Sequence, residues 1–142
     1  MSNETITVSD LDEFTRAYVE AALWSTSDES DESGGDPMDD NYDAWDIDGE
    51  TLAGMAADCA KFQAENAADL ALYDSPQWTA AELGGHDFWL TRNGHGCGFW
   101  DRNGILPEDA GERLTAAAEK YGEVYLYVGD EDAEGCRYIY AN

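Results

Sequence analysis

Carboxylate side chains dominate the charge of this chain, and they limit how it can fold. Its 142 residues include 32 Asp and Glu against 7 Lys and Arg, which gives a formal net charge of −25. Charged side chains are almost never fully buried unless they are paired, so most of these carboxylates must lie on the surface. The core must come from the 43% of residues that are hydrophobic. A chain of this length buries enough surface for one domain, which we expect to span residues 1–142.

The sign of the charge also excludes several classes of partner. Nucleic acids are bound through cations that neutralise phosphates, and no basic patch is visible in this sequence. An anionic membrane surface repels such a chain, and no apolar run approaches 18 residues. The first residues lack the basic and apolar regions of a signal peptide. We therefore expect a cytoplasmic protein that binds neither nucleic acid directly nor a membrane.

Periodic apolar residues and turn signals predict the order of the elements. Helices are expected from Ser9 to about Trp24, from Asp48 to about Leu70, in a short segment between Ser75 and Gly85, and from Pro107 to Gly122. Strands are expected at 86–91 and 97–100, around the turn dipeptide Asn93-Gly94, and at 124–128 and 136–140. The predicted fold is α+β, with a small antiparallel sheet of two hairpins packed against about three helices.

The three long helices each carry an apolar stripe at helical spacing, which predicts the core. The stripes consist of Leu11, Phe14, Tyr18 and Ala21, then Leu52, Met55, Cys59 and Phe62, then Ala110, Leu114, Ala117 and Tyr121. Residues four apart lie on one face of a helix, so each stripe should face the interior.

The segment 28–50 is the most acidic part of the chain. It holds eleven acids, among them Asp39, Asp40 and Asp43, and no Lys or Arg. The run Ser33-Gly34-Gly35-Asp36-Pro37 within it is typical of turns and linkers. We expect a mobile acidic loop at about 28–47, anchored to the core by apolar side chains. The candidate anchors are Met38, Tyr42, Trp45 and Ile47.

Residues 85–104 are the most unusual segment, since they gather aromatic and basic side chains. Both histidines of the chain lie here, and the pattern Phe-Trp-x-(x)-Arg-Asn-Gly occurs twice. Exposed Trp and Arg are favoured at binding hot spots. The candidate binding residues are therefore Trp89, Arg92, His95, Trp100 and Arg102, joined by Asp39, Asp40 and Asp43 of the acidic loop. In a purely structural alternative, the pattern is a strand running into a turn, and Arg92 and Arg102 pair with internal carboxylates.

Catalytic and metal-binding patterns are weak. His86, His95, Cys97 and Cys136 are side-chain types that bind zinc, but they lack the usual ligand spacing. His95 and Cys97 can share one face of a strand as base and nucleophile, but no orienting third group can be assigned. The three cysteines are interpreted as reduced thiols. We expect no metal, no cofactor and no enzymatic activity.

The segment Gly85–Arg102, which reads GHDFWLTRNGHGCGFWDR, resembles a family of small acidic proteins encoded in bacteriophage genomes. Asp39-Asp40-Asn41-Tyr42 and the strand Tyr125–Asp130 are similar too. The resemblance covers most of the chain. It implies a phage-encoded protein located in the host cytoplasm, and it implies no catalytic residues.

Three hypotheses about function remain open at this stage. In the first, the chain is a non-enzymatic phage accessory protein that binds a basic, DNA-binding host protein and inhibits a nuclease or defence complex by mimicking DNA. A domain of this size has a diameter of roughly 37 Å, and B-DNA of that length carries about 22 phosphates. In the second, the acidity serves solubility or salt adaptation. In the third, residues 85–104 form a small-molecule-binding or enzymatic site.

Overall fold

The computed structural model describes residues 8–28, 36–38, 42–94, 98–99, 104–129, 133, 135 and 137–141. Within them lie four α-helices: α1 (Glu13–Ser25), α2 (Gly49–Leu70), α3 (Ala80–Arg92) and α4 (Glu108–Glu119). Strand β1 (Ser27–Asp28) pairs with β2 (Asp36–Pro37), and β3 (Leu126–Val128) pairs with β4 (Ile139–Ala141), both antiparallel. Two short 3-10 helices are η1 (Val8–Asp10) and η3 (Ala44–Asp46). The α+β class is confirmed, but the predicted sheet of two hairpins against about three helices is not, because the described residues form four α-helices and two separate two-stranded pairings.

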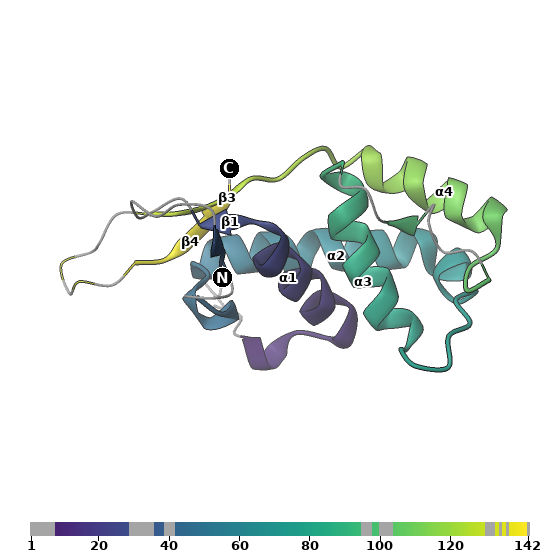
Figure 1. Ribbon diagram of the computed structural model, residues 1–142, viewed down its shortest axis with the longest axis horizontal. Coiled ribbons are helices and arrows are strands. Elements are labelled where there is room, and N and C mark those ends of the chain that lie inside the picture. The colour runs from purple at the N-terminus through teal and green to yellow at the C-terminus, as the bar shows by residue number, and fades with distance from the viewer. Residues whose placement is uncertain are drawn as a thin grey trace, which may run out of the picture.

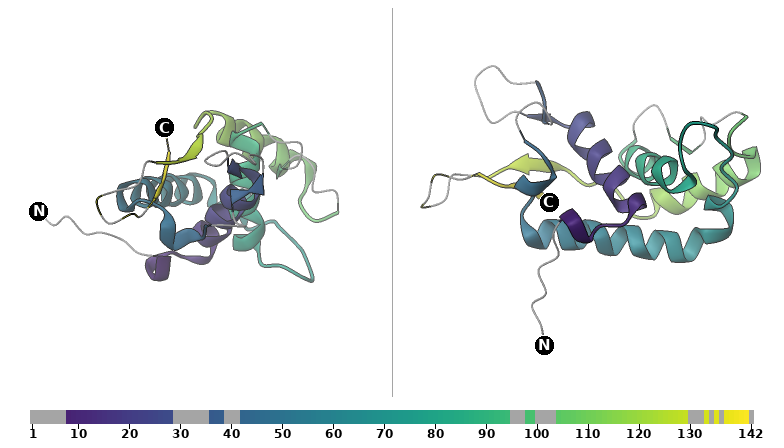
Figure 2. Two further views of the ribbon diagram at one scale, coloured as in Figure 1. Left: turned by 60° about the vertical axis from the view of Figure 1, so that its left-hand side comes forward. Right: turned by 90° about the horizontal axis from the view of Figure 1, so that it is seen from below.

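The helices pack around the long helix α2 (Figure 1). α1 and α3 lie against each other on one side of α2, and α4 packs against α2 and α3. The β3/β4 hairpin lies at the other end of the molecule, beside the start of α2 (Figures 1 and 2). A backbone hydrogen bond from Asp48 N to Ile139 O ties the hairpin to that end of α2. This is one of the two hairpins that the sequence predicts.

Polar side chains define where the helices begin. Asp48 caps α2 as predicted, and its carboxylate accepts a hydrogen bond from Thr51 N at 3.2 Å. The start of α1 was placed too early, because Asp12 rather than Ser9 is the cap and accepts from Thr15 N at 2.9 Å. Ser9 instead belongs to η1. Each cap satisfies backbone N–H groups that have no partner inside the helix.

The hairpin predicted around Asn93-Gly94 is wrong, since residues 80–92 form α3. Thr79 and Glu82 make a reciprocal capping box that starts this helix after Trp78. α3 is buried on nearly all sides, so it lacks the polar face by which an amphipathic helix is identified. Asn93 ends the helix, and Gly94 follows with φ 71°, a conformation typical of glycine just after a helix.

The glycine pair expected to stop a helix lies inside α3 instead. Gly84 and Gly85 face α1, where a Cβ on Gly85 would overlap the carbonyl oxygen of Phe14. A Cβ on Gly84 would come within 2.8 Å of the Phe14 ring. The pair therefore permits a close approach of two helices, and this need outweighs the poor helix propensity of glycine.

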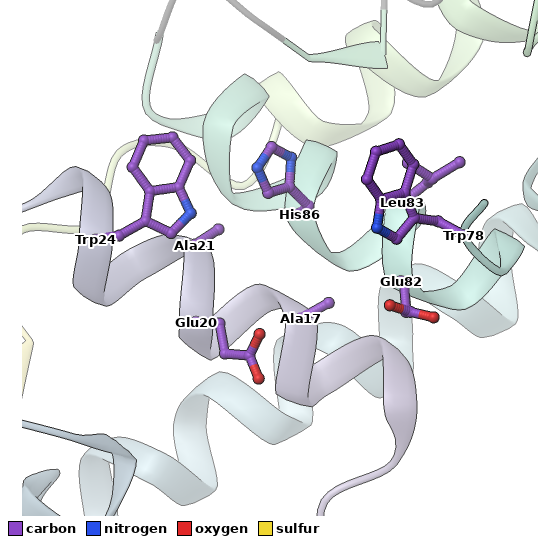
Figure 3. Close-up of a pocket in the computed structure, with 8 residues that line it drawn as sticks. All are labelled: Ala17, Glu20, Ala21, Trp24, Trp78, Glu82, Leu83 and His86. Atoms are coloured by element: carbon purple, nitrogen blue, oxygen red, sulfur yellow. The ribbon is translucent and has the colours of Figure 1, made fainter. Parts of the chain in front are cut away.

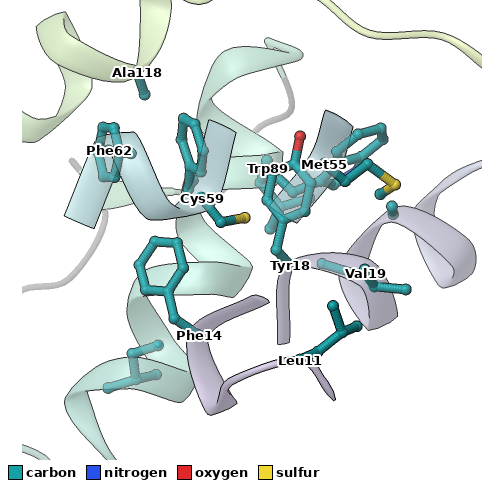
Figure 4. Close-up of a cluster of buried hydrophobic side chains, with 14 of the residues drawn as sticks. Leu11, Phe14, Tyr18, Val19, Met55, Cys59, Phe62, Trp89 and Ala118 are labelled. Carbon is teal, nitrogen blue, oxygen red and sulfur yellow. The ribbon is translucent and has the colours of Figure 1, made fainter. Parts of the chain in front are cut away.

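Aromatic side chains from α1, α2 and α3 fill the centre of the fold (Figure 4). Phe62 of α2 stacks on Phe88 of α3 with ring centroids 4.1 Å apart, and Phe14 of α1 packs at 6.2 Å from both rings. The predicted apolar stripes of α1 and α2 are fully buried. In the stripe of α4, Ala110 and Leu114 are buried, while Ala117 and Tyr121 are half-buried.

The acidic segment is held to the body at several described points. Met38 and Ile47 are buried and serve as anchors as predicted, whereas Trp45 is 62% exposed. Residues 29–35 and 39–41 lie outside the described part of the chain. The mobility of residues 28–47 stays a prediction.

Candidate functional site

The predicted binding residue Trp89 lies in the core, with only 2% of its surface exposed. Its ring packs edge-on against Tyr18 at 5.3 Å, and its Nε1–H donates to Oγ of Ser25 at 2.7 Å. Trp89 therefore joins α3 to the end of α1 and offers almost no surface to a partner. Buried tryptophans commonly satisfy their one donor in this way.

Arg92 is also inside the fold, with 5% exposure. Its guanidinium donates to Tyr18 Oη at 3.1 Å, to Asp58 Oδ2 at 2.9 Å and to the carbonyls of Tyr121 and Gly122 at 2.9 and 2.8 Å. The rings of Phe88 and Tyr121 lie 5.6 and 5.5 Å from its Cζ. The internal ion pair considered for Arg92 is thus present, and this side chain is unavailable to a partner.

Of the other predicted site residues, one lies on the described surface and the rest fall outside the residues that the structure describes. Asp43 is exposed and caps η3, where its carboxylate accepts from Trp45 N at 2.9 Å. The predicted site residues outside the described part are Asp39, Asp40, His95, Trp100 and Arg102. Cys97 and Cys136 are outside it as well. Cys59 is a buried free thiol whose pKa is raised by burial.

The described surface does contain a groove lined by aromatic and acidic side chains, between α1 and α3 (Figure 3). Its volume is about 370 Å³. The lining consists of Ala17, Glu20, Ala21, Trp24, Trp78, Glu82, Leu83 and His86. We call this the α1/α3 groove.

Three aromatic rings occupy one side of the α1/α3 groove, and two carboxylates occupy the other (Figure 3). Trp24 is 46% exposed and Trp78 is 51% exposed. The imidazole of His86 stacks on Trp24 with centroids 5.6 Å apart. The carboxylates of Glu20 and Glu82 lie below this aromatic row in Figure 3. Large exposed aromatic rings beside carboxylates suit a ligand that is both flat and cationic.

Helical spacing explains how the chain builds this arrangement. On α1, Glu20 and Trp24 are four residues apart, and so are Ala17 and Ala21, whose small side chains leave space in the groove. On α3, Glu82 and His86 are four apart. Residues at i and i+4 lie on the same helix face, so each helix contributes one carboxylate and one ring to the groove.

A buried carboxylate lies directly behind His86. Asp87 is fully buried, and its Oδ2 accepts a hydrogen bond from Tyr73 Oη at 2.6 Å. Nδ1 of His86 lies 3.4 Å from the Oδ1 of Asp87. This contact orients the imidazole at the groove wall. The groove lining given above includes two carboxylates and one imidazole but no hydroxyl or thiol side chain.

A second acidic recess, of about 710 Å³, lies between α2 and the β3/β4 hairpin. Tyr127 and Tyr140 line it with rings stacked at 5.8 Å, together with Asp48, Glu50 and Asp58. Two of these carboxylates already serve the fold, because Asp48 caps α2 and Asp58 pairs with Arg92. In the α1/α3 groove one of the two carboxylates does so, because Oε1 of Glu82 belongs to the capping box with Thr79. We take the α1/α3 groove as the candidate site because it also holds two exposed tryptophans, Trp24 and Trp78.

Sequence reasoning missed the residues of the α1/α3 groove. Trp24 falls outside the predicted apolar stripe of its helix, and this was the one available signal. Trp78 was predicted within the short helix between Ser75 and Gly85, and His86 was predicted on a strand and considered only as a zinc ligand, so neither was placed beside α1.

Comparisons with known proteins identify no relative of this chain. No family model, curated protein or solved structure matches the chain. No group of His, Cys, Asp and Glu in the described part of the chain is arranged to hold a metal ion. None of the described helices combines the length and apolar character needed to cross a bilayer.

Proposed function

We propose that this chain is a non-enzymatic protein that binds a basic protein partner through the α1/α3 groove. The observation that carries the proposal is the exposure of Trp24 and Trp78 beside Glu20 and Glu82. Tryptophan is among the residues most enriched at interface hot spots, where it supplies most of the binding energy. The net charge of −25 favours a cationic partner and speeds its approach.

The finer proposal is that the partner is a DNA-binding host protein and that the chain is a phage accessory protein acting as a DNA mimic. Its support is the total charge and the resemblance of residues 85–102 to phage-encoded acidic proteins. Exposed carboxylates are present on three of the described helices: Glu13 and Glu20 on α1, Glu50 and Glu65 on α2, and Glu112 and Glu119 on α4. Mimicry then depends on the whole surface, and the groove supplies the specific anchor.

The test of the basic-partner proposal is binding of a labelled basic peptide, measured by fluorescence anisotropy at near-physiological salt. Trp24→Ala and Trp78→Ala should each weaken binding about tenfold, as loss of a hot spot does. Trp45→Ala is the matched control, because Trp45 is more exposed than either and lies outside the groove.

A peptide of the same length with neutral side chains should not bind. The proposal fails if the neutral peptide binds equally well. It also fails if Trp45→Ala weakens binding as much as the groove variants, since diffuse charge would then account for the interaction. Salt adaptation would in that case become the better explanation of the acidity.

A further inference from the structure

The α1/α3 groove contains the same kinds of group that bind an arginine inside this fold. Arg92 is held by two aromatic rings, at 5.6 and 5.5 Å, and by the carboxylate of Asp58 at 2.9 Å. This internal arginine shows how the chain stabilises a guanidinium, with aromatic rings near its Cζ and oxygen acceptors for its N–H groups. The α1/α3 groove repeats the combination at the surface, with Trp24 and Trp78 as rings and Glu20 and Glu82 as acceptors.

The groove has no lysine or arginine among its lining residues. The two lysines of the chain, Lys61 and Lys120, line a different recess, between α2 and α4. Arg16 of α1 donates to the carbonyls of Leu11 and Ser9, at 3.1 and 3.4 Å. Arg113 is engaged with Asp69, whose carboxylate lies 2.8 and 2.9 Å from its Nη2 and Nε. The two glutamates and the aromatic rings of the groove match an added cation in charge and shape, since no lysine or arginine lines the groove.

We infer that the α1/α3 groove is a receptor for an arginine side chain of a basic protein segment, and that it prefers arginine to lysine. This inference rests on the proposed function and specifies its ligand. A guanidinium is planar and weakly hydrated, so it stacks on an indole while its edge donates two hydrogen bonds to one carboxylate. The ammonium of lysine is compact and strongly hydrated, and it does neither as well.

The experiment compares three peptides that differ only in the cationic residue, which is arginine, lysine or the neutral analogue citrulline. At near-physiological salt the arginine peptide should bind about three- to fivefold more tightly than the lysine peptide, in line with the strength of exposed cation–π contacts. The citrulline peptide should show no saturable binding, because it keeps the shape of arginine without its charge. Glu20→Gln combined with Glu82→Gln should abolish the preference for arginine. Glu112→Gln combined with Glu119→Gln on α4 is the matched control, because it removes the same number of charges from exposed positions outside the groove.

The indole N–H resonances of the unmodified protein provide a second measurement that does not depend on any variant. Addition of the arginine peptide should shift the Trp24 and Trp78 signals. It should leave the Trp89 signal in place, because that N–H donates to Ser25 in the core.

The outcomes separate this inference from the proposed function. Equal affinity for the arginine and lysine peptides, with Trp24 and Trp78 still shifting, overturns the arginine preference and leaves a groove for basic partners. Unshifted Trp24 and Trp78 signals under saturating peptide overturn both. If citrulline shifts them as strongly as arginine, the groove binds by shape alone and the arginine inference is wrong.

Discussion

Single residues of α3 control how closely the helices approach one another, and Gly85 is the clearest case. A Cβ there would overlap the backbone carbonyl oxygen of Phe14, which cannot move away without displacing α1. Gly85→Ala should lower the free energy of unfolding by about 2–3 kcal/mol, the cost of overpacking a core contact. Urea denaturation measures this loss.

Gly54 in α2 is the matched control for Gly85. It is also a helical glycine, but no atom lies within 4 Å of where its Cβ would be. Gly54→Ala should therefore be neutral or stabilising by up to about 1 kcal/mol, because alanine has the better helix propensity. Equal effects of the two substitutions would show that contact with α1 does not explain Gly85.

Arg92 fixes the position of the chain after α4 by donating to the carbonyls of Tyr121 and Gly122. Arg92→Lys keeps the charge but loses the planar set of donors, and leaves buried acceptors without partners. We expect a loss of about 2–3 kcal/mol in the free energy of unfolding. Arg113→Lys is the comparison, since Arg113 binds Asp69 at the surface and its replacement should leave stability unchanged within error. A small effect of Arg92→Lys would mean that water replaces the lost donors.

At the scale of elements, the helices that the sequence predicted well are those with one polar face. α1, α2 and α4 show apolar stripes at helical spacing, and Asp48 and Pro107 mark two of their starts. α3 was predicted only in part, as a short helix ending at Gly84-Gly85, and its second half was predicted as a strand. Residues 87–92 are all buried, so this half of the helix shows no polar face that would identify it. The groove was missed for the same reason. Its two walls meet only when α3 is a helix packed on α1, and no local pattern in the sequence reports that packing.

The cap of α1 provides a test at the element scale that depends on pH. Burial alone would raise the pKa of Asp12, but hydrogen bonds from Thr15 and Gln63 outweigh it and hold that pKa below its ordinary value. A carboxylate with a lowered folded pKa stabilises the protein above its unfolded pKa of about 3.9, and this stabilisation is lost as pH falls through the folded pKa.

Asp12→Ala should accordingly cost about 1 kcal/mol at neutral pH, the usual value for an N-cap. The difference from the parent protein should shrink as the solution is acidified below about pH 4. Asp12→Asn is the control, because asparagine also caps helices and does not titrate. Thermal melts across this pH range measure the effect. A difference that stays constant with pH would assign the contribution of Asp12 to packing alone.

At the scale of the whole molecule, negative charge and the aromatic groove should make separable contributions to binding. Charge acts over a Debye length of about 8–10 Å and is screened by added salt, whereas desolvated aromatic contacts persist.

If the chain mimics DNA, a basic DNA-binding protein retained on the immobilised chain should be released by duplex DNA, and its affinity should fall steeply with salt. Trp24→Ala and Trp78→Ala together should remove the part of the affinity that resists salt and leave the steep part. Neutralising the exposed acids Glu50, Glu65, Glu112 and Glu119 should do the reverse. Release of the partner by salt but not by DNA would exclude mimicry, because the DNA-binding surface of the partner would then be free in the complex. The groove would in that case hold a basic segment on another face of the partner.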